Sequence, residues 1–253
     1  LVQIEKSIFV LAKRAFQLHL FISTIINDSY STLIKDHIEY DLSIIIPVLL
    51  KLGTLKNSKL SIEKYIHYIE SNDKELLPLV LELVESTFSS QSKKYTLPLI
   101  DPDIKPSKIA IGLFDDNFLT KNEMLLFWMN SNHNWKRTIT LNYCIKNEKT
   151  KLLKKVKWQS NNGIIKNYTF LSNSEQQYIN RNFLNNGISI EEQNIMYSIL
   201  EKTILLKSVN LFRKIPGNVL SKIAQISSEV HLEENDVIFK EGEPGNSLFV
   251  IIS

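Results

Sequence analysis

The spacing of apolar residues changes once along this sequence, near residue 230. Before that point apolar side chains recur every three or four positions, which is the period of an amphipathic helix. After it they alternate with polar side chains, which is the period of a β-strand. A chain with this pattern is expected to fold mainly into α-helices and to add strands only at its end.

The first expected helix, residues 3–26, carries a wide apolar face made of two stripes. A face this wide favours packing in a bundle or solenoid over an isolated coiled coil. Two shorter helices are expected at 31–39 and 41–52, with Gly53 as a C-terminal stop. The two stripes are Ile4, Ile8, Leu11, Ala15, Leu18, Ile22 and Ile25, and Phe9, Ala12, Phe16 and Leu20.

A helix pair around a short polar turn occurs twice. Residues 65–85, YIHYIESNDKELLPLVLELVE, align without gaps to residues 125–145, LLFWMNSNHNWKRTITLNYCI. Both copies carry Ser-Asn at the turn, at 71–72 and 131–132. Paired amphipathic helices of this kind are the repeating unit of an α-helical solenoid.

The second helix of the first copy has its own local signals. Asn72 and Glu75 have the spacing of a capping box at its start. Pro78 falls inside it and is expected to kink it. Stacking as a solenoid would bury its apolar face, which includes Leu79, Val80 and Leu83. Between the two copies, three prolines are expected to break any long element: Pro98, Pro102 and Pro106.

The last third of the chain is divided by a linker. Residues 146–190 are expected to hold one or two loosely packed helices, and the linker to end near Gly187. A helix follows at 190–206, and Pro216 suits the first turn of another. Strands are expected at 230–234, 236–240 and 248–252, with a tight turn at 241–245.

Composition narrows the class of protein. The net charge of +3 is too small to indicate nucleic-acid binding. Cys144 is the single cysteine, so no disulfide forms within the chain, and a reducing compartment fits. No apolar run approaches the roughly 18 residues of a membrane span, so this piece is expected to be soluble. The first residue is Leu1 rather than Met and the last strand is cut, so we expect a piece of a longer protein.

No metal-binding constellation is predicted, and no catalytic residue is assigned. The histidines lack metal-ligand spacing, and the paired aspartates are typical of turns rather than of acid–base pairs. No P-loop, dinucleotide-binding, nucleophile-elbow or zincin motif occurs. The residues considered were His19, His37, His67, His133 and His231, and Asp101, Asp103, Asp115 and Asp116.

Three further side chains are expected to be structural. Cys144 lies on an apolar helical stripe and is interpreted as a packed small residue rather than a nucleophile. Trp128 and Trp135 flank the turn at 131–134 and are interpreted as core or groove residues of the repeat.

Residues 146–157 carry six lysines and one glutamate. This basic segment could lie against anionic lipid or meet an acidic partner. The favoured interpretation is a solvated helix face.

Residues 205–253 resemble the opening half of a cyclic nucleotide-binding domain. That family opens with an LF..IP...L..IA helix and continues into a β-roll whose second and third strands are joined by an I..EGE.G..L..I turn. The matching residues are Leu211, Phe212, Ile215, Pro216, Leu220, Ile223 and Ala224, then Ile238, Glu241, Gly242, Glu243, Gly245, Leu248 and Ile251.

The resemblance implies a truncated β-roll for cyclic AMP or cyclic GMP. Gly242 and Gly245 would shape the turn rather than contact ligand, and Asn246 stands where the family often has Asp. In the family, a later helix N-terminus with an arginine grips the ligand's phosphate. That segment would lie beyond Ser253, so the ligand-binding residues are unknown and this piece itself holds no cofactor.

The first 190 residues resemble the HEAT-like helical segment of some bacterial membrane proteins. In those, a transporter core similar to ADP/ATP carriers precedes the repeats, and a cyclic nucleotide-binding domain follows them. The resemblance implies a HEAT-like repeat domain at 1–189 and an incomplete nucleotide domain at 190–253. It also implies a position on the cytoplasmic side of the bacterial inner membrane, attached through an upstream transporter.

The function expected from these features is regulatory and non-enzymatic. Ligand binding to the complete roll would shift the helices at 190–228 and, through them, the array. The alternative is a scaffold whose repeats bind a protein partner and whose nucleotide domain is degenerate. Nucleic acid is expected as a partner in neither case.

Overall fold

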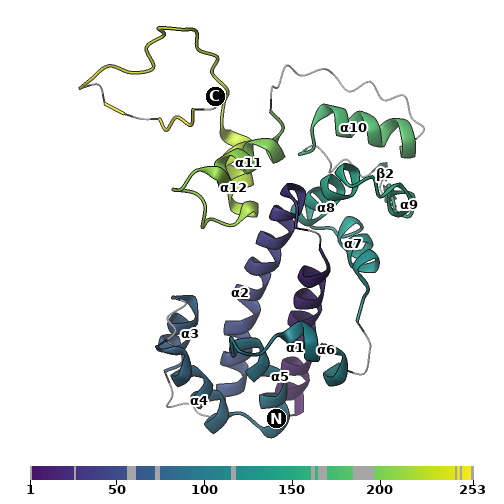
Figure 1. Ribbon diagram of the computed structural model, residues 1–253, viewed down its shortest axis with the longest axis vertical. Coiled ribbons are helices and arrows are strands. Elements are labelled where there is room, and N and C mark those ends of the chain that lie inside the picture. Colours follow the sequence, from purple (N-terminus) through teal and green to yellow (C-terminus); the bar gives the residue numbers. More distant parts are fainter. Residues whose placement is uncertain are drawn as a thin grey trace. The chain divides into compact units, whose positions relative to one another are not determined.

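The computed structural model describes residues 2–25, 27–55, 61–71, 75–114, 118–160, 163–164, 170–184, 197–242, 244–245 and 247–251. The chain forms two units, Leu1–Lys157 and Trp158–Ser253 (Figure 1). The predicted domain boundary at 189/190 lies outside the described residues and stays a prediction. Within the described part of the chain, no helix is both long enough and apolar enough to cross a membrane.

The mainly α-helical class is confirmed. The elements of the first unit are α1 Val2–Thr24, a 3₁₀ turn Ser29–Ser31, α2 Thr32–Thr54, α3 Glu63–Glu70, α4 Leu77–Thr87, α5 Ser90–Ile100, α6 Pro106–Phe114, α7 Lys121–Met129, α8 Asn134–Lys146 and α9 Thr150–Leu153.

The helices α1 and α2 form a long hairpin (Figure 1). Most of the wide face predicted for α1 is buried: Ala12, Ala15 and Phe16 are fully buried, whereas Phe9, at one edge of that face, is 36% exposed. Two alanines on that face let a neighbouring backbone approach closely, while Phe16 fills the space beside them.

Two separate helices were predicted where α2 runs unbroken, and that prediction is wrong. The polar interval at Tyr40 and Asp41 is no loop, because Asp41 is buried in ion pairs. Gly53 lies inside α2 rather than after it. A Cβ at Gly53 would overlap the ring of Phe88, so this glycine permits a close helix contact rather than a C-terminal stop.

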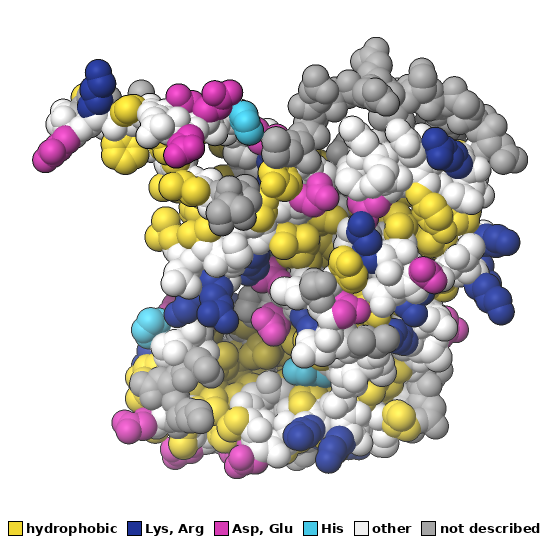
Figure 2. Space-filling view, turned by 45° about the horizontal axis from the view of Figure 1, so that its top comes forward, with side chains coloured by type: hydrophobic (Ala, Val, Ile, Leu, Met, Phe, Trp, Pro, Cys, Tyr) yellow, Lys and Arg dark blue, Asp and Glu magenta, His cyan; other side chains and the backbone are white. Residues whose placement is uncertain are grey.

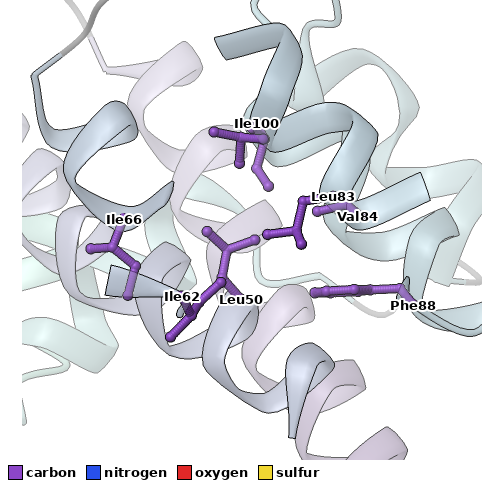
Figure 3. Close-up of a cluster of buried hydrophobic side chains, with 8 residues drawn as sticks. Leu50, Ile62, Ile66, Leu83, Val84, Phe88 and Ile100 are labelled. Carbon is purple, nitrogen blue, oxygen red and sulfur yellow. The ribbon is translucent and has the colours of Figure 1, made fainter. Parts of the chain in front are cut away.

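The helices α3, α4 and α5 close over the end of α2 around one apolar cluster (Figure 3). Its buried members are Leu50, Ile62, Ile66, Val80, Leu83, Val84, Phe88 and Ile100. Of the three α4 residues predicted to be buried, Val80 and Leu83 are, but Leu79 is 44% exposed. The apolar face of α4 is therefore narrower than its sequence indicates.

One proline prediction is also wrong. Pro78 stands in the first turn of α4, where its missing N–H costs nothing, so the helix starts there instead of kinking. Pro98 lies in the last turn of α5, which ends at Ile100, so no long described element runs through the three prolines. Pro106 begins α6, as a residue that breaks the preceding segment would. The predicted cap at Asn72 lies outside the described residues.

Sequential helices pack against each other, as in a solenoid: α3 with α4, α4 with α5, α5 with α6, and α7 with α8. The helix α1 also contacts α5, α6 and α7, which are remote in sequence. Aromatic rings join α1 to α5 and α6, with ring centroids 5.1 to 5.5 Å apart. These rings belong to Phe9, Phe16, Tyr95, Phe114 and Phe118.

The second unit contains a short antiparallel pair, β1 Gln159–Ser160 with β2 Gly163–Ile164, then α10 Asn173–Ile179, a π-helix Asn180–Leu184, α11 Ile199–Ser208 and α12 Gly217–Ile226. The helices α11 and α12 pack around Leu206, Phe212, Leu220 and Ala224. The first of these helices was predicted to span 190–206, but Ser198 is its N-cap and the helix begins at Ile199, so the predicted continuity through 197–198 is wrong. Residue 190 itself lies outside the described part of the chain.

The strands predicted at 230–234, 236–240 and 248–252 are not formed in the described residues of those ranges. Val237, Phe239 and Ile251 are exposed, so the apolar face of an alternating pattern has nothing to pack against. A strand needs a hydrogen-bonded neighbour and a covered face before it is stable.

The narrow apolar face of α4 gives a paired stability prediction. Leu83→Ala removes a buried side chain and should cost about 2–5 kcal/mol of unfolding free energy. Leu79→Ala, one turn away and half exposed, should cost less than about 0.5 kcal/mol. Urea melts followed by tryptophan fluorescence compare the two, and equal losses would contradict this packing.

Two of the helical glycines, Gly53 and Gly112, should respond oppositely to alanine. Gly53→Ala forces a methyl group into the Phe88 ring and should cost about 1–3 kcal/mol. Gly112→Ala, in α6 with nothing within 4 Å of the added Cβ, should gain about 0.5–1 kcal/mol. Thermal melts report both. Partial recovery in Gly53→Ala/Phe88→Leu relative to Gly53→Ala would assign the loss to this contact.

Candidate functional site

A buried carboxylate joins three helices of the first unit. Asp41, on α2, is 8% exposed. Lys136 Nζ, from α8, donates to Asp41 Oδ2 at 2.7 Å, and Arg14 Nη2, from α1, donates to the same oxygen at 3.3 Å. Burial raises the pKa of Asp41, but the hydrogen bond and charge of Lys136 outweigh it, so that pKa lies below its usual value.

His37 lies one turn before Asp41 on α2 and is 2% exposed. Its Nε2 is 3.7 Å from Asp41 Oδ1, too far for a hydrogen bond. Its ring lies edge-on to Trp128, with centroids 5.7 Å apart, and 5.6 Å from the ring of His133. Burial lowers the pKa of His37 to about 4, so the ring is neutral at pH 7.

The N-terminus of α8 completes this cluster. His133 is the N-cap, and its Nδ1 accepts the backbone N–H of Lys136 at 3.4 Å. Lys136 Nζ also lies 5.3 Å from the centroid of the Trp128 ring, a cation–π distance. Burial, and then the charge of Lys136, lowers the pKa of His133. The cap therefore holds an unprotonated Nδ1 that faces the helix.

Arg137, the next residue on α8, is buried and has no acidic partner in the part of the chain that the structure describes. It is 5% exposed, and its Nη2 donates to the carbonyl of Ser131. Its Nε and Nη1 make no hydrogen bond among the described residues. Burial lowers the pKa of Arg137, with no opposing charge nearby. A guanidinium stays charged in proteins, so this burial is costly.

The sequence did not predict that these side chains converge. The five histidines were read as scattered, yet His37 and His133 meet, while His67 and His231 are exposed and His19 is partly buried. One local signal was present: Asp41 interrupts an apolar helical stripe and lies at the i+4 spacing from His37. The partners on α1 and α8 leave no local signal.

The other predicted residues take structural positions. Trp128, Trp135 and Cys144 are buried, as expected of core residues, and burial raises the pKa of the Cys144 thiol to about 12. The thiol is therefore protonated at neutral pH. The N–H of Asp103 donates to Asp101 Oδ1 at 2.9 Å, a turn contact. Asp115 and Asp116 lie outside the described residues.

The basic segment is exposed to solvent. Lys151, Lys154, Lys155 and Lys157 all lie on the surface around α9. On the face shown in Figure 2, lysines and arginines form separate groups interspersed with acidic side chains.

The two turn glycines differ. Gly242 has φ of 86°, a left-handed conformation that favours glycine. Gly245 has no such φ, and a Cβ at either position would meet nothing within 4 Å. Glu243 and Asn246, between and beside them, lie outside the described residues.

An apolar pocket of about 340 Å³ lies between α1, α6 and the start of α7. Two hydrogen bonds between the side chain of Gln17 and the backbone of Leu119 fix one wall. Lys121 Nζ donates to the carbonyl of Thr24 at 2.9 Å at its rim. The lining residues are Leu20, Phe21, Thr24, Ile111, Phe118, Leu119, Thr120 and Lys121.

No cluster of three or more His, Cys, Asp or Glu side chains suited to a metal occurs among the described residues. The chain matches no known family model and no solved structure. Functional inferences about the first unit therefore rest on the geometry of its side chains.

The depressed pKa of His37 makes the stability of the first unit depend on pH. The folded protein holds the ring neutral down to about pH 4, whereas the unfolded chain protonates it near 6.5. The unfolded state thus binds more protons in this window, and stability is full above pH 6.5 and falls as pH drops toward 4. Asp41, whose pKa is also depressed, adds a further loss below about pH 4.

We expect about 2 kcal/mol of unfolding free energy to be lost between pH 7 and pH 5. His37→Phe removes this titration and should make the profile clearly shallower in that window, where His133, whose pKa burial also lowers, still contributes. His67→Phe, on the exposed face of α3, should leave the profile unchanged. Urea melts at several pH values test this. An unaltered slope in His37→Phe would overturn the assignment to His37.

Proposed function

We propose that this chain is a non-catalytic regulatory piece in which a HEAT-like helical array is coupled to the N-terminal part of a cyclic nucleotide-binding domain. The parent protein would be a bacterial membrane transporter similar to ADP/ATP carriers, with this region on its cytoplasmic side. The observation that carries the proposal is the packing of α11 and α12 by the side chains of the family's helical motif.

Most apolar residues of the motif LF..IP...L..IA belong to one buried cluster. Phe212, Leu220 and Ala224 are buried in one cluster, and Ile215 and Ile223 pack against it. Leu211, the remaining apolar motif position, is exposed. Most motif residues therefore act together as a core.

The segment after α12 also returns to this cluster. Val250 packs against it from the far end of the chain. Lys202 pairs with Glu229 at 3.0 Å and donates to the carbonyl of Ser227 at 3.2 Å, which ties α11 to the residues that follow α12. A roll whose strands continue from here would share its base with α11 and α12.

This arrangement suggests how a ligand signal would travel. A cyclic nucleotide bound by the complete roll would have a higher affinity for one arrangement of α11 and α12 than for another. Only such a difference in affinity can shift the protein from one arrangement to the other. Glu241 is negatively charged, as is the phosphate of a cyclic nucleotide, so cationic donors have to come from outside the described turn.

A protein-interaction scaffold with a degenerate nucleotide domain is the second candidate. It is supported by the apolar pocket beside α1, where Ile111 and Leu119 are more than one-third exposed, and by Phe127, exposed on α7. Exposed apolar side chains grouped near a pocket are typical of protein-binding surfaces.

Calorimetry with cyclic AMP and cyclic GMP tests the proposal on two proteins, the 253-residue chain and the product of the full-length gene. We expect binding only by the full-length protein. Micromolar binding to the 253-residue chain would contradict the assignment of the phosphate site, and no binding by either protein would favour the scaffold.

The turn glycines supply matched variants in the full-length protein. Gly242→Val places a β-branched residue at a φ of 86° and should weaken nucleotide binding at least about tenfold through the distorted turn. Gly245→Ala, at an ordinary φ with open space around it, should change the affinity less than about threefold.

A further inference from the structure

The first turns of α8 carry buried donors that have no acceptor. Among the described residues, Trp135 Nε1, Thr138 Oγ1, and Nε and Nη1 of Arg137 are buried and make no hydrogen bond. None of these three residues is more than 5% exposed. Buried donors are almost always paired, so four such donors on three residues within four positions of one helix indicate an acceptor that the described chain does not supply.

Arg137 is the most costly member of this group. Among the described residues, the only hydrogen bond of its guanidinium goes from Nη2 to the carbonyl of Ser131, and no carboxylate pairs with it. A buried guanidinium that lacks a counter-ion is strongly unfavourable, whereas one that binds an oxyanion through two parallel N–H groups is stabilised. The missing acceptor is therefore expected to be negatively charged.

The bond to Ser131 directs the guanidinium back toward the N-terminus of α8, a 13-residue helix. The first turn of a helix leaves N–H groups without intrahelical acceptors and carries a partial positive charge. His133 accepts the N–H of Lys136, while those of Asn134 and Trp135 have no acceptor in the described structure. The helix end and the arginine thus present donors to the same neighbourhood.

The charges around this end are mainly positive. Lys136 and Arg14 share one carboxylate, Asp41, so two cations meet one anion even before Arg137 is counted. His133 and Asn134 are exposed, which opens the helix end to solvent.

We propose that the N-terminal turn of α8 binds a small oxyanion, phosphate or carboxylate, held by the Arg137 guanidinium, the Thr138 hydroxyl and the N–H groups of Asn134 and Trp135. The planar guanidinium matches both oxyanions with two parallel hydrogen bonds. Helix N-termini are recurrent sites for both. This site contains no residue of the proposed nucleotide domain, so the outcome of its test is independent of the nucleotide proposal.

Titration of the purified chain with sodium phosphate and with sodium acetate tests the site, with sodium chloride at matched ionic strength as the reference. We expect a saturable rise in Tm of about 5 °C with at least one oxyanion and none with chloride. In ¹⁵N-resolved NMR spectra, the amides of Asn134 and Trp135 and the indole N–H of Trp135 should shift along the same saturation curve.

Arg137→Met is the decisive variant, because it removes the buried charge and keeps an apolar stem. It should melt above the wild type without oxyanion and lose the oxyanion-dependent rise. Lys155→Met, which removes an exposed lysine beside α9, should keep that rise. Thr138→Val, nearly isosteric, should require roughly fivefold more oxyanion for half-saturation, and it provides a second test should Arg137→Met not fold.

An equal response to chloride in the wild type would overturn the proposal. An undiminished response in the variant that folds, Arg137→Met or Thr138→Val, would do the same.

Discussion

The arrangement of the first unit depends on one buried carboxylate. Asp41 is removed from water, and such a group is tolerated only where opposite charges and hydrogen bonds replace its hydration. Lys136 and Arg14 provide these from α8 and α1. Because both cations bond the same oxygen, α1, α2 and α8 are held in one register, and the N-terminus of α8 is fixed beside His37.

Apolar contacts also hold the helices of the first unit together. Ala12 and Ala15 bury the face of α1 with little bulk, and the ring of Phe114 joins α1 to α6. In a pure solenoid each repeat contacts only its neighbours. Here the long hairpin of α1 and α2 also contacts helices remote in sequence, so the short helices are stabilised by the hairpin as well as by each other.

The two units differ in the kind of side chain that lacks a full set of contacts among the described residues. The first unit buries donors at the start of α8 that lack acceptors, whereas the second exposes apolar side chains such as Phe239 and Ile251 after α12. The former suits a small charged ligand, and the latter suits further polypeptide.

The sequence by itself determined the helical class, the extent of α1 and the burial of Trp128, because a 3.6-residue apolar period records which face meets a core. It did not determine that α2 is continuous through Asp41, or that Arg137 is buried without a counter-ion among the described residues. Nor did its period of two produce strands after α12 in the described residues. Those outcomes depend on partners distant in the chain, since burying a charge or pairing a strand is favourable only when the complementary group arrives from another element, and only the tertiary structure decides which groups arrive.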